Sequence, residues 1–172
     1  VDASTGQLSL TRVLDFETNS SYNVTISVTD DPVPTEGTSR TATAVVECFV
    51  LDVNEAPTLA TSCTEDGSFA ACGTVSESAA PGVDLGIVVS ASDVDAQQSV
   101  TYFIDSGNEG GAFKLDEVTG SLTVAHANVL NYESVHKTYS LAVSARDNGS
   151  PPLSASGQVR VTVSDANEAP VV

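Results

Sequence analysis

Basic residues are scarce in this chain: its 172 residues hold 6 Lys and Arg against 23 Asp and Glu, a formal net charge of −17. This deficit argues against nucleic acid, whose phosphates need Lys and Arg, and against anionic membrane surfaces. No run reaches the roughly 18 consecutive apolar residues of a transmembrane helix. The first residues lack the character of a signal peptide, so we expect any targeting signal outside this stretch.

Catalytic signatures are also missing. The two histidines, His126 and His136, flank no serine or cysteine nucleophile elbow, and no segment resembles a phosphate-binding loop. Asp93 and Asp95 can be read as a catalytic pair, but acids in a sandwich loop are far more often ligands or solvated groups. We therefore expect that the protein is not an enzyme.

Tryptophan is absent and other aromatics are few, and no long apolar stretch has the 3.6-residue period of a helix. Val, Thr, Ser and Ala dominate instead, which favours strands. Tyr139, Leu141 and Val143 alternate with the polar Ser140 and Ser144, the period-two pattern of a half-buried antiparallel strand. We expect strands at 44–52, 75–77, 85–91, 100–104, 112–115, 121–124, 139–146 and 158–165. About seven short strands separated by Gly, Asn, Asp and Pro indicate an all-β Greek-key sandwich.

An internal repeat divides the chain. The matching segments are 5–8 with 119–122, 14–17 with 130–133, 22–30 with 139–147, and 44–52 with 158–165. We predict two domains: 1–57, the C-terminal part of one repeat with its linker, and 58–172, a complete repeat with its own C-terminal linker. The first repeat begins at what would be its fourth or fifth strand, so we expect it to be truncated and unable to close a core alone.

The two most distinctive stretches are DVNEAP at 52–57 and DANEAP at 165–170. The proline has no N–H and a fixed φ, so it ends the preceding strand and sets a stiff exit. The side-chain oxygens before it include no Lys or Arg, and they repel one another unless a hard cation lies between them. We expect each stretch to mark a joint between repeated domains and to bind Ca²⁺.

These landmarks together resemble the extracellular cadherin repeat. The resemblance rests on LDFE at 14–17, DVD at 93–95, the strand end SARD at 144–147, the joint at 52–57, and Glu77 at the place of the family's N-terminal glutamate. It covers essentially the whole chain. It implies tandem seven-stranded, immunoglobulin-like sandwiches at the cell surface, with calcium ions at each junction between successive repeats.

The resemblance also implies a ligand set. For the junction between the two repeats the set is Asp15, Glu17, Asp52, Asn54, Glu55, Asp93, Asp95 and Asp147, with a backbone carbonyl from Asn108. The junction after the second repeat would use Glu77, Glu133, Asn167 and Glu168. That second junction needs a following repeat, and Asn131 stands where the first repeat has Asp15, so we expect it to bind weakly or not at all.

Calcium takes six to eight hard oxygen ligands in a flexible geometry. Carboxylates from separate segments supply them without the Cys or His that zinc favours. We expect Ca²⁺ to stiffen the chain rather than to take part in catalysis. The expected function is a calcium-dependent extracellular adhesion or spacer module. The alternative is a calcium-dependent carbohydrate-binding adhesin or a structural component of an extracellular filament, although sugar sites often stack the sugar on an aromatic and these are scarce here.

Expected partners are the adjacent repeats of a longer chain and a homophilic or heterophilic protein. In one branch of the family a tip repeat docks an N-terminal tryptophan into its partner. The absence of tryptophan here favours an interior position.

Three cysteines are present. Cys63 and Cys72 bracket a short polar run, and an extracellular setting favours a disulfide between them, with two free thiols as the alternative. Cys48 takes the position of Val161 in the second copy, so we expect a buried small hydrophobe.

Three Asn-x-Ser/Thr sequons occur, at Asn19, Asn23 and Asn148. They fall on predicted loops or solvent-facing strand positions. They favour a secreted chain that carries glycans.

Overall fold

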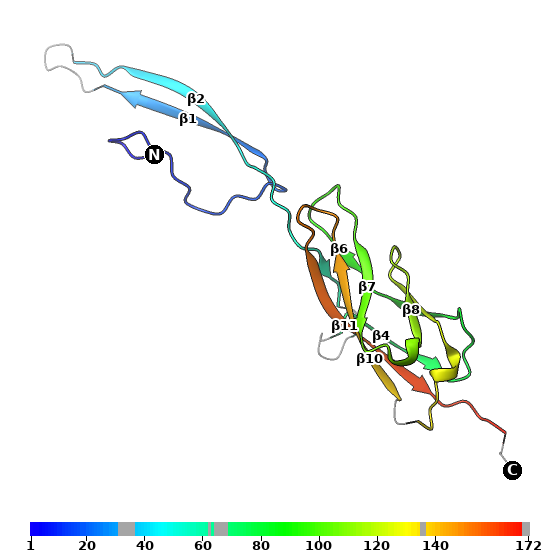
Figure 1. The fold of residues 1–172 in the computed structure, drawn as a ribbon. Coiled ribbons are helices and arrows are strands. Elements are labelled where there is room, and N and C mark those ends of the chain that lie inside the picture. The colour runs from blue at the N-terminus through cyan, green and yellow to red at the C-terminus, as the bar shows by residue number, and fades with distance from the viewer. Residues whose placement is uncertain (31–36, 62, 64–68, 135–136, 170–172) are drawn as a thin grey trace. The chain divides into compact units, whose positions relative to one another are not determined.

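Strands dominate the fold of this chain. The computed structural model describes every residue except 31–36, 62, 64–68, 135–136 and 170–172 (Figure 1). The chain separates into two compact units, Val1–Val53 and Asn54–Val172, each of which is described by itself. Among the described residues the helical segments are two 3₁₀ turns, η1 (Glu109–Gly111) and η2 (Ala127–Val129). Across this described part, no helix has both the length and the apolarity needed to span a membrane.

The first unit is built on one antiparallel hairpin, β1 (Ser21–Thr29) with β2 (Thr41–Phe49). Tyr22 pairs with Cys48 and Val24 with Val46, so these side chains share one apolar face. Residues 8–12 and 14 line a pocket of about 300 Å³ over this face. Cys48 is only half-buried there, not buried as the repeat alignment predicted, because the described residues of this unit include no second sheet to cover the hairpin.

The second unit repeats the same hairpin within a full sandwich. Its strands β10 (Thr138–Arg146) and β11 (Ser154–Ser164) pair with Tyr139 opposite Val161, as Tyr22 lies opposite Cys48 in the first unit. The internal repeat read from the sequence is therefore also a repeat of strand register.

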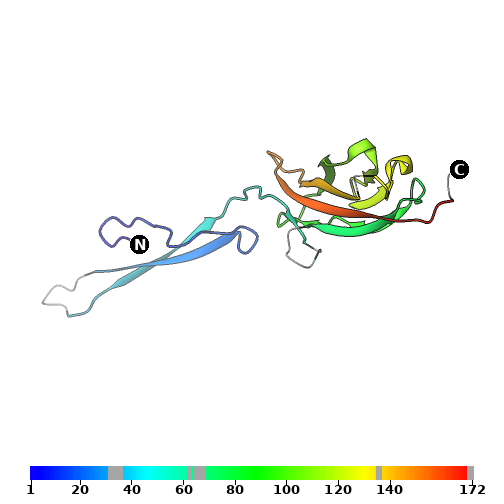
Figure 2. The same cartoon turned by 90° about the horizontal axis from the view of Figure 1, so that it is seen from below.

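Two further strands complete this layer. Its order is β4 (Ala71–Ser76), β11, β10, β7 (Thr101–Ser106). The β4–β11 pair is parallel and the others are antiparallel. In Figure 2 the orange and red strands β10 and β11 lie next to each other in the second unit.

The second layer consists of β5 (Asp84–Val88), β9 (Ser121–Val124) and β8 (Phe113–Leu115), continued by the short pair β3 (Thr58–Leu59) and β6 (Ala91–Ser92). Backbone hydrogen bonds join the two parts across residues 89 and 90: the Val89 N–H donates to the Gly120 carbonyl, and the Ala60 N–H donates to the Ser90 carbonyl. Gly120 has a φ of +68°, and a side chain there would collide with the Val89 carbonyl, so glycine is required.

The hydrophobic core lies between the two layers. Leu141, Val143, Val159 and Val161 of the first layer are completely buried, as is Leu122 of the second. The rings of Phe113 and Tyr139 pack edge to face with centroids 5.0 Å apart. The tyrosine hydroxyl donates to the Val129 carbonyl, which ties η2 to the core.

Most predicted strands are present with shifted ends. Strand β2 begins and ends three residues before the predicted 44–52, and β4 begins at Ala71, well before the predicted 75. The sequence missed β3 and β6, because two-residue strands are too short to show alternation.

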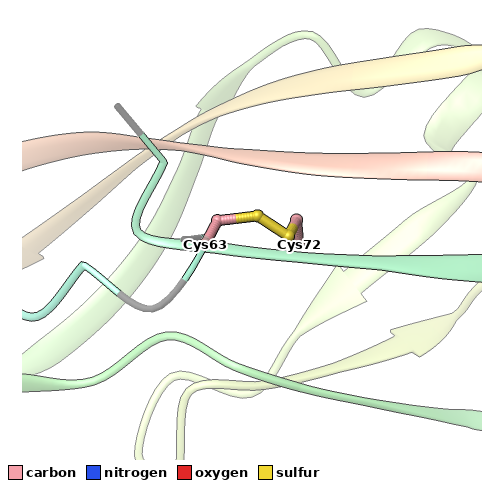
Figure 3. The surroundings of a disulfide bond; sticks show 2 residues. All are labelled: Cys63 and Cys72. Carbon is pink, nitrogen blue, oxygen red and sulfur yellow. A yellow bond between two sulfur atoms is a disulfide. The ribbon is translucent and has the colours of Figure 1, made fainter. Parts of the chain in front are cut away.

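The structure joins Cys63 to Cys72 in a disulfide, with Cα atoms 5.6 Å apart (Figure 3). Residues 64–68 of the enclosed loop lie outside the described residues. Phe69 pairs with Cys63 across the loop, and the Arg160 guanidinium lies 4.7 Å above the Phe69 ring. The bond fastens the segment in which the chain passes from β3 in one layer to β4 in the other.

Replacing Leu141 with alanine tests the core. Because the side chain is completely buried between the layers, Leu141→Ala should lower the free energy of unfolding of the second unit by about 2–5 kcal/mol in a urea titration. Ser140→Ala is the matched control, since Ser140 is exposed on the opposite face of β10, and it should change stability by less than about 0.5 kcal/mol. Equal effects of the two substitutions would contradict the assignment of faces.

Candidate metal sites

Oxygen-bearing side chains gather at one end of the second unit, where several strands begin or end. Asp93 and Asp95 follow β6, Asp147 follows β10, and Asn54 and Glu55 precede β3. We call this group the Asp95 site. Side-chain hydrogen bonds link its segments: the Asn54 amide donates to Asp147 Oδ2 at 3.3 Å and to the Pro151 carbonyl at 3.0 Å.

Asp147 is the most firmly held member, with 5% of its surface exposed. The Leu153 N–H donates to both carboxylate oxygens, and the Gly149 N–H donates to Oδ1 at 3.0 Å. Burial works to raise the pKa of Asp147, but these bonds and the one from Asn54 outweigh it, so the pKa lies below its usual value. Asp147 is thus a preformed carboxylate anion.

Asp95 is also buried, at 7% exposure. Its Oδ2 accepts hydrogen bonds from the Glu55 N–H at 3.1 Å and from Gln98 Nε2 at 2.9 Å. The same Gln98 amide donates to Asn54 Oδ1. Gln98 therefore bridges the linker and the loop after β6.

Two buried oxygens in this site have no hydrogen-bond partner, Asp93 Oδ2 and Gln98 Oε1. The other Asp93 oxygen accepts from the Asp95 N–H at 3.0 Å. Buried polar atoms are almost always paired, so a buried carboxylate oxygen without a donor calls for an explanation. A hard cation provides one, because every side chain of the Asp95 site offers oxygen atoms. The donor set fits Ca²⁺.

Gly149 keeps the Asp95 site open. A side chain at this position would occupy the place of Asn54 Oδ1 and collide with Gln98. The Asn54 amide reaches Asp147 and Pro151 only because position 149 carries no side chain.

The structure does not bring Asn108 to this group. Asp147 directly follows Arg146, which pairs with Thr101, whereas Ser106 pairs with Ala142. Along β10, Asp147 is five residues, or about 16 Å, from Ala142, the residue that pairs with Ser106. Asn108 follows Ser106 and is therefore still farther from Asp147. The Asn108 side chain instead closes its own loop, accepting from the Phe113 N–H and donating to the Phe113 carbonyl. The expectation that its carbonyl is a ligand is wrong for this geometry.

Three of the expected ligands, Asp15, Glu17 and Asp52, belong to the first unit, and all three are exposed. Asp15 accepts hydrogen bonds from the Thr18 N–H at 3.0 Å and the Thr18 hydroxyl at 2.9 Å. These bonds lower the pKa of Asp15. In the second unit Asn131 makes the corresponding bond, accepting from the Ser134 N–H at 3.0 Å. The second unit thus has the same hydrogen-bonded turn as the first, but with the neutral Asn131 at the position of the charged Asp15.

A second acidic group lies elsewhere in the second unit, and we call it the Glu168 site. One carboxylate oxygen from each of its members lies within 4.8 Å of those of the others; the members are Glu77, Glu133, Asp165 and Glu168. The parallel pairing of β4 with β11 sets Ser76 opposite Ser164, so the residues that follow, Glu77 and Asp165, emerge side by side. Asn167, which was also expected here, is exposed and directly precedes Glu168.

Glu77 is the organising member of the Glu168 site. Its Oε2 accepts from the Tyr132 N–H at 2.8 Å and its Oε1 from the Ala166 N–H at 2.7 Å, and these bonds lower its pKa. Glu168 shows the opposite effect. Partial desolvation, with the negative charges of Glu77, Glu133 and Asp165, raises the pKa of Glu168. The hydrogen bonds to Glu77 therefore do not offset the mutual repulsion of the four carboxylates in the Glu168 site.

Sequence reasoning missed Gln98 and Asp165. Gln98 follows Asp95 by three residues in a tight turn, a spacing too common to mark a ligand-bridging amide. Asp165 had a usable signal, because it is the counterpart of Asp52 in the repeated DxNEAP stretch. Of the histidines, His126 bonds the Gly111 carbonyl through Nδ1 at 2.9 Å, and His136 lies outside the described residues.

The family model of the cadherin domain matches residues 1–51 and 72–164. Human protocadherin Fat 1 is 36% identical over 169 residues, 98% of this chain and 3% of that protein. The Fat-like cadherin-related tumor suppressor homolog of Drosophila melanogaster is 35% identical with the same coverage. This chain thus spans only a small part of the length of these relatives.

Solved structures agree with this similarity. Protocadherin gamma B2 extracellular cadherin domains 1–5 align with a TM-score of 0.69 and 28% identity, over 91% of this chain and 28% of that one. Mouse cadherin-23 EC22–24 aligns with a TM-score of 0.66 and 26% identity, over 90% of this chain and 45% of that one.

Geometry and similarity define the same class, an all-β sandwich repeat arranged in tandem. The chain belongs to the cadherin family. It is an extracellular or cell-surface segment, an adhesion or structural module.

The pH dependence of stability tests the state of Asp147. A carboxylate whose folded pKa is lowered stabilises the fold fully above the unfolded pKa, and this contribution is lost as the pH falls through the folded value. Asp147→Asn, whose amide nitrogen cannot accept from Leu153, should therefore be less stable than the parent at pH 7 in chelator. The difference should shrink below about pH 4.

Urea unfolding at several pH values measures this difference. Glu117→Gln is the control, because it also removes one negative charge but does so at an exposed position in the turn between β8 and β9. A stability difference between Asp147→Asn and the parent that is independent of pH would show that the charge of Asp147 does not matter to folding.

Proposed function

We propose that this segment is a calcium-dependent adhesion or spacer module in which Ca²⁺ binds at the ends of the sandwich repeats and rigidifies their junctions. One observation carries the proposal: a buried carboxylate oxygen of Asp93 has no partner in a site made of oxygen donors. Membership of the cadherin family supports it. The proposed role is mechanical and not enzymatic.

The proposed ligands of the first junction come from both units. The first unit would supply Asp15, Glu17 and Asp52; the second would supply Asn54, Glu55, Asp93, Asp95 and Asp147. Asn108 is left out because of its distance from Asp147 along β7 and β10. The Glu168 site, with Asn167 beside it, would serve the junction with a following repeat.

Bound Ca²⁺ supplies positive charge and six to eight coordination positions that link separate chain segments. The chain's own residues prepare for it. Hydrogen bonds from Leu153 and Gly149 fix Asp147 as an anion, and Gln98 holds Asp95 and Asn54 together. Pro57, which is buried, ends the linker with a fixed φ. These constraints leave few conformations to be lost when an ion binds, which favours stiffening.

The proposed partners are the neighbouring repeats of the same chain and, through the assembled rod, a homophilic or heterophilic protein. Extracellular modules of this kind bind calcium at about 0.1–1 mM, close to the concentration outside cells. The junctions would therefore stay filled outside the cell and lose their ions in chelator.

A calcium titration tests the proposal. Calcium should raise the melting temperature of the chain with a midpoint of about 0.1–1 mM. Small-angle scattering should show a longer, stiffer particle than in chelator. Both responses should be lost in Asp93→Ala/Asp95→Ala, because Asp93 carries the unpartnered oxygen and the buried Asp95 carboxylate accepts from the Glu55 N–H of the linker.

Asp105→Ala/Glu117→Ala is the matched control, since it removes the same charge from exposed positions on β7 and in the β8–β9 turn. This variant should respond to calcium like the parent. If the parent itself showed no change in shape or stability up to 10-fold above about 1 mM calcium, the acids would be surface charge only and the proposal would fail.

For the Glu168 site we predict a substitution effect on the melting temperature that has opposite signs without calcium and with calcium plus a following repeat. A carboxylate with a raised folded pKa destabilises the fold at neutral pH, and the cost fades as the pH falls towards the unfolded value. Glu168→Gln should therefore melt higher than the parent in chelator at pH 7, because it removes one of four crowded charges. With calcium, and with a following repeat attached, it should melt lower because a ligand is lost.

Glu117→Gln is again the control and should shift neither melting temperature. An increase for Glu168→Gln in both solutions would mean that the Glu168 site holds repulsion only, and would remove it from the proposed ligand set.

A further inference from the structure

The outward face of the first hairpin carries two large apolar side chains without cover. The pairs Asn23–Glu47 and Thr25–Val45 lie on this face, with Ser21–Phe49 at its end. Phe49 is 70% exposed and Val45 is 66% exposed, among otherwise polar neighbours. Val45 and Phe49 lie on either side of Glu47 along β2, and exposed apolar side chains on a strand are a liability for association.

For Val45 this exposure does not result from the small size of the first unit. In the second unit the positions equivalent to Asn23, Glu47 and Val45 are Ser140, Arg160 and Gln158, as the matching registers show. All three stay exposed although their sheet has four strands and a second layer behind it. These positions point to solvent in a complete sandwich too, while Thr162, the equivalent of Phe49, is half-buried beside β4. In the second unit the face carries polar side chains where the first unit has Val45 and Phe49.

The first unit also has a feature that the second lacks at this place. Asn23-Val24-Thr25 is a sequon, and Asn23 is exposed. Asn23 lies directly opposite Glu47, so Val45 and Phe49 are its two diagonal neighbours on the partner strand. Diagonal neighbours lie about 7–8 Å apart, within reach of a sugar attached to the asparagine amide.

We propose that Asn23 is the glycosylated sequon of this hairpin and that the first N-acetylglucosamine of its glycan packs on the ring of Phe49. The sugar ring presents a face of C–H groups, which packs on the negative face of an aromatic ring, while its hydroxyls remain in water. The glycan thereby replaces the polar residues of the second unit as the cover of this face. The inference rests on the extracellular location of the chain and not on calcium.

The other sequons offer no such surface. Asn19 lies in the turn closed by Asp15, two residues after Glu17. Asn148 is exposed, and its side-chain oxygen accepts from the Ser99 N–H at 2.9 Å beside the Asp95 site. A glycan at either position would lie over polar loops.

The test uses the chain secreted from a glycosylating host. Peptide mass spectrometry should find a glycan on Asn23. Isotope-labelled glycan in NMR should show upfield-shifted protons on the first N-acetylglucosamine, from the ring current of Phe49. The upfield shift should disappear in Phe49→Leu and in Phe49→Thr, the residue found at the equivalent position 162, while Asn23 stays glycosylated.

A second readout is self-association, followed by sedimentation over a concentration series. Asn23→Gln should associate more strongly than the parent, whereas Asn19→Gln, the matched control, should not. Both readouts should be the same in calcium and in chelator, which separates them from the junction proposal. An unoccupied Asn23, a sugar shift that survives Phe49→Leu, or association of the glycosylated parent through this face would each overturn the inference; the last would mark an interface with a second copy.

Discussion

The fold depends on keeping carboxylates out of the sandwich interior while holding them close together at its ends. The described core between the layers is apolar, and the acids that are buried among the described residues, Asp95 and Asp147, lie where strands end and loops begin. Each of these two carboxylates is stabilised by backbone N–H donors from neighbouring loops. The price is a local excess of negative charge that the protein's six basic side chains do not neutralise.

Strand pairing produces both acidic groups. Antiparallel pairing of β7 with β10 ends near Arg146, which brings the residue after it, Asp147, to the end where the linker enters. Parallel pairing of β4 with β11 makes the two strands end together, so that Glu77 and Asp165 leave the sheet side by side. A shift of either register by one residue would reverse the faces of the strand and separate the ligands. The sheet is therefore the scaffold of the charge clusters, and core stability and site geometry are coupled.

The sequence predicted much of this arrangement because its signals are local. Alternation located the main strands, and the repeated DxNEAP stretch located the joints, so the grouping of Asn54 with Asp95 and Asp147 was expected. Asn108 was misplaced because sequence order does not give the register of β7 on β10. Gln98 and the strands β3 and β6 were missed because a single amide and two-residue strands have no pattern. The half-buried state of Cys48 followed from its unit's lack of a covering sheet among the described residues, which the repeat alignment alone does not show.

The two units show how one backbone pattern accommodates different surface chemistry. Their hairpins share register residue by residue, so positions on the inward face must remain apolar in both, as Val24 and Leu141 do. The outward face has no such constraint, because water accepts any polar side chain there. An apolar side chain there stays in contact with water unless something else covers it. Phe49 and Val45 occur on the hairpin whose outward strand face carries the sequon Asn23; the corresponding positions of the second unit, where Ser140 stands in place of Asn23, carry Thr162 and Gln158. The difference between the repeats is then a consequence of which cover is available, a glycan on one hairpin and water on the other.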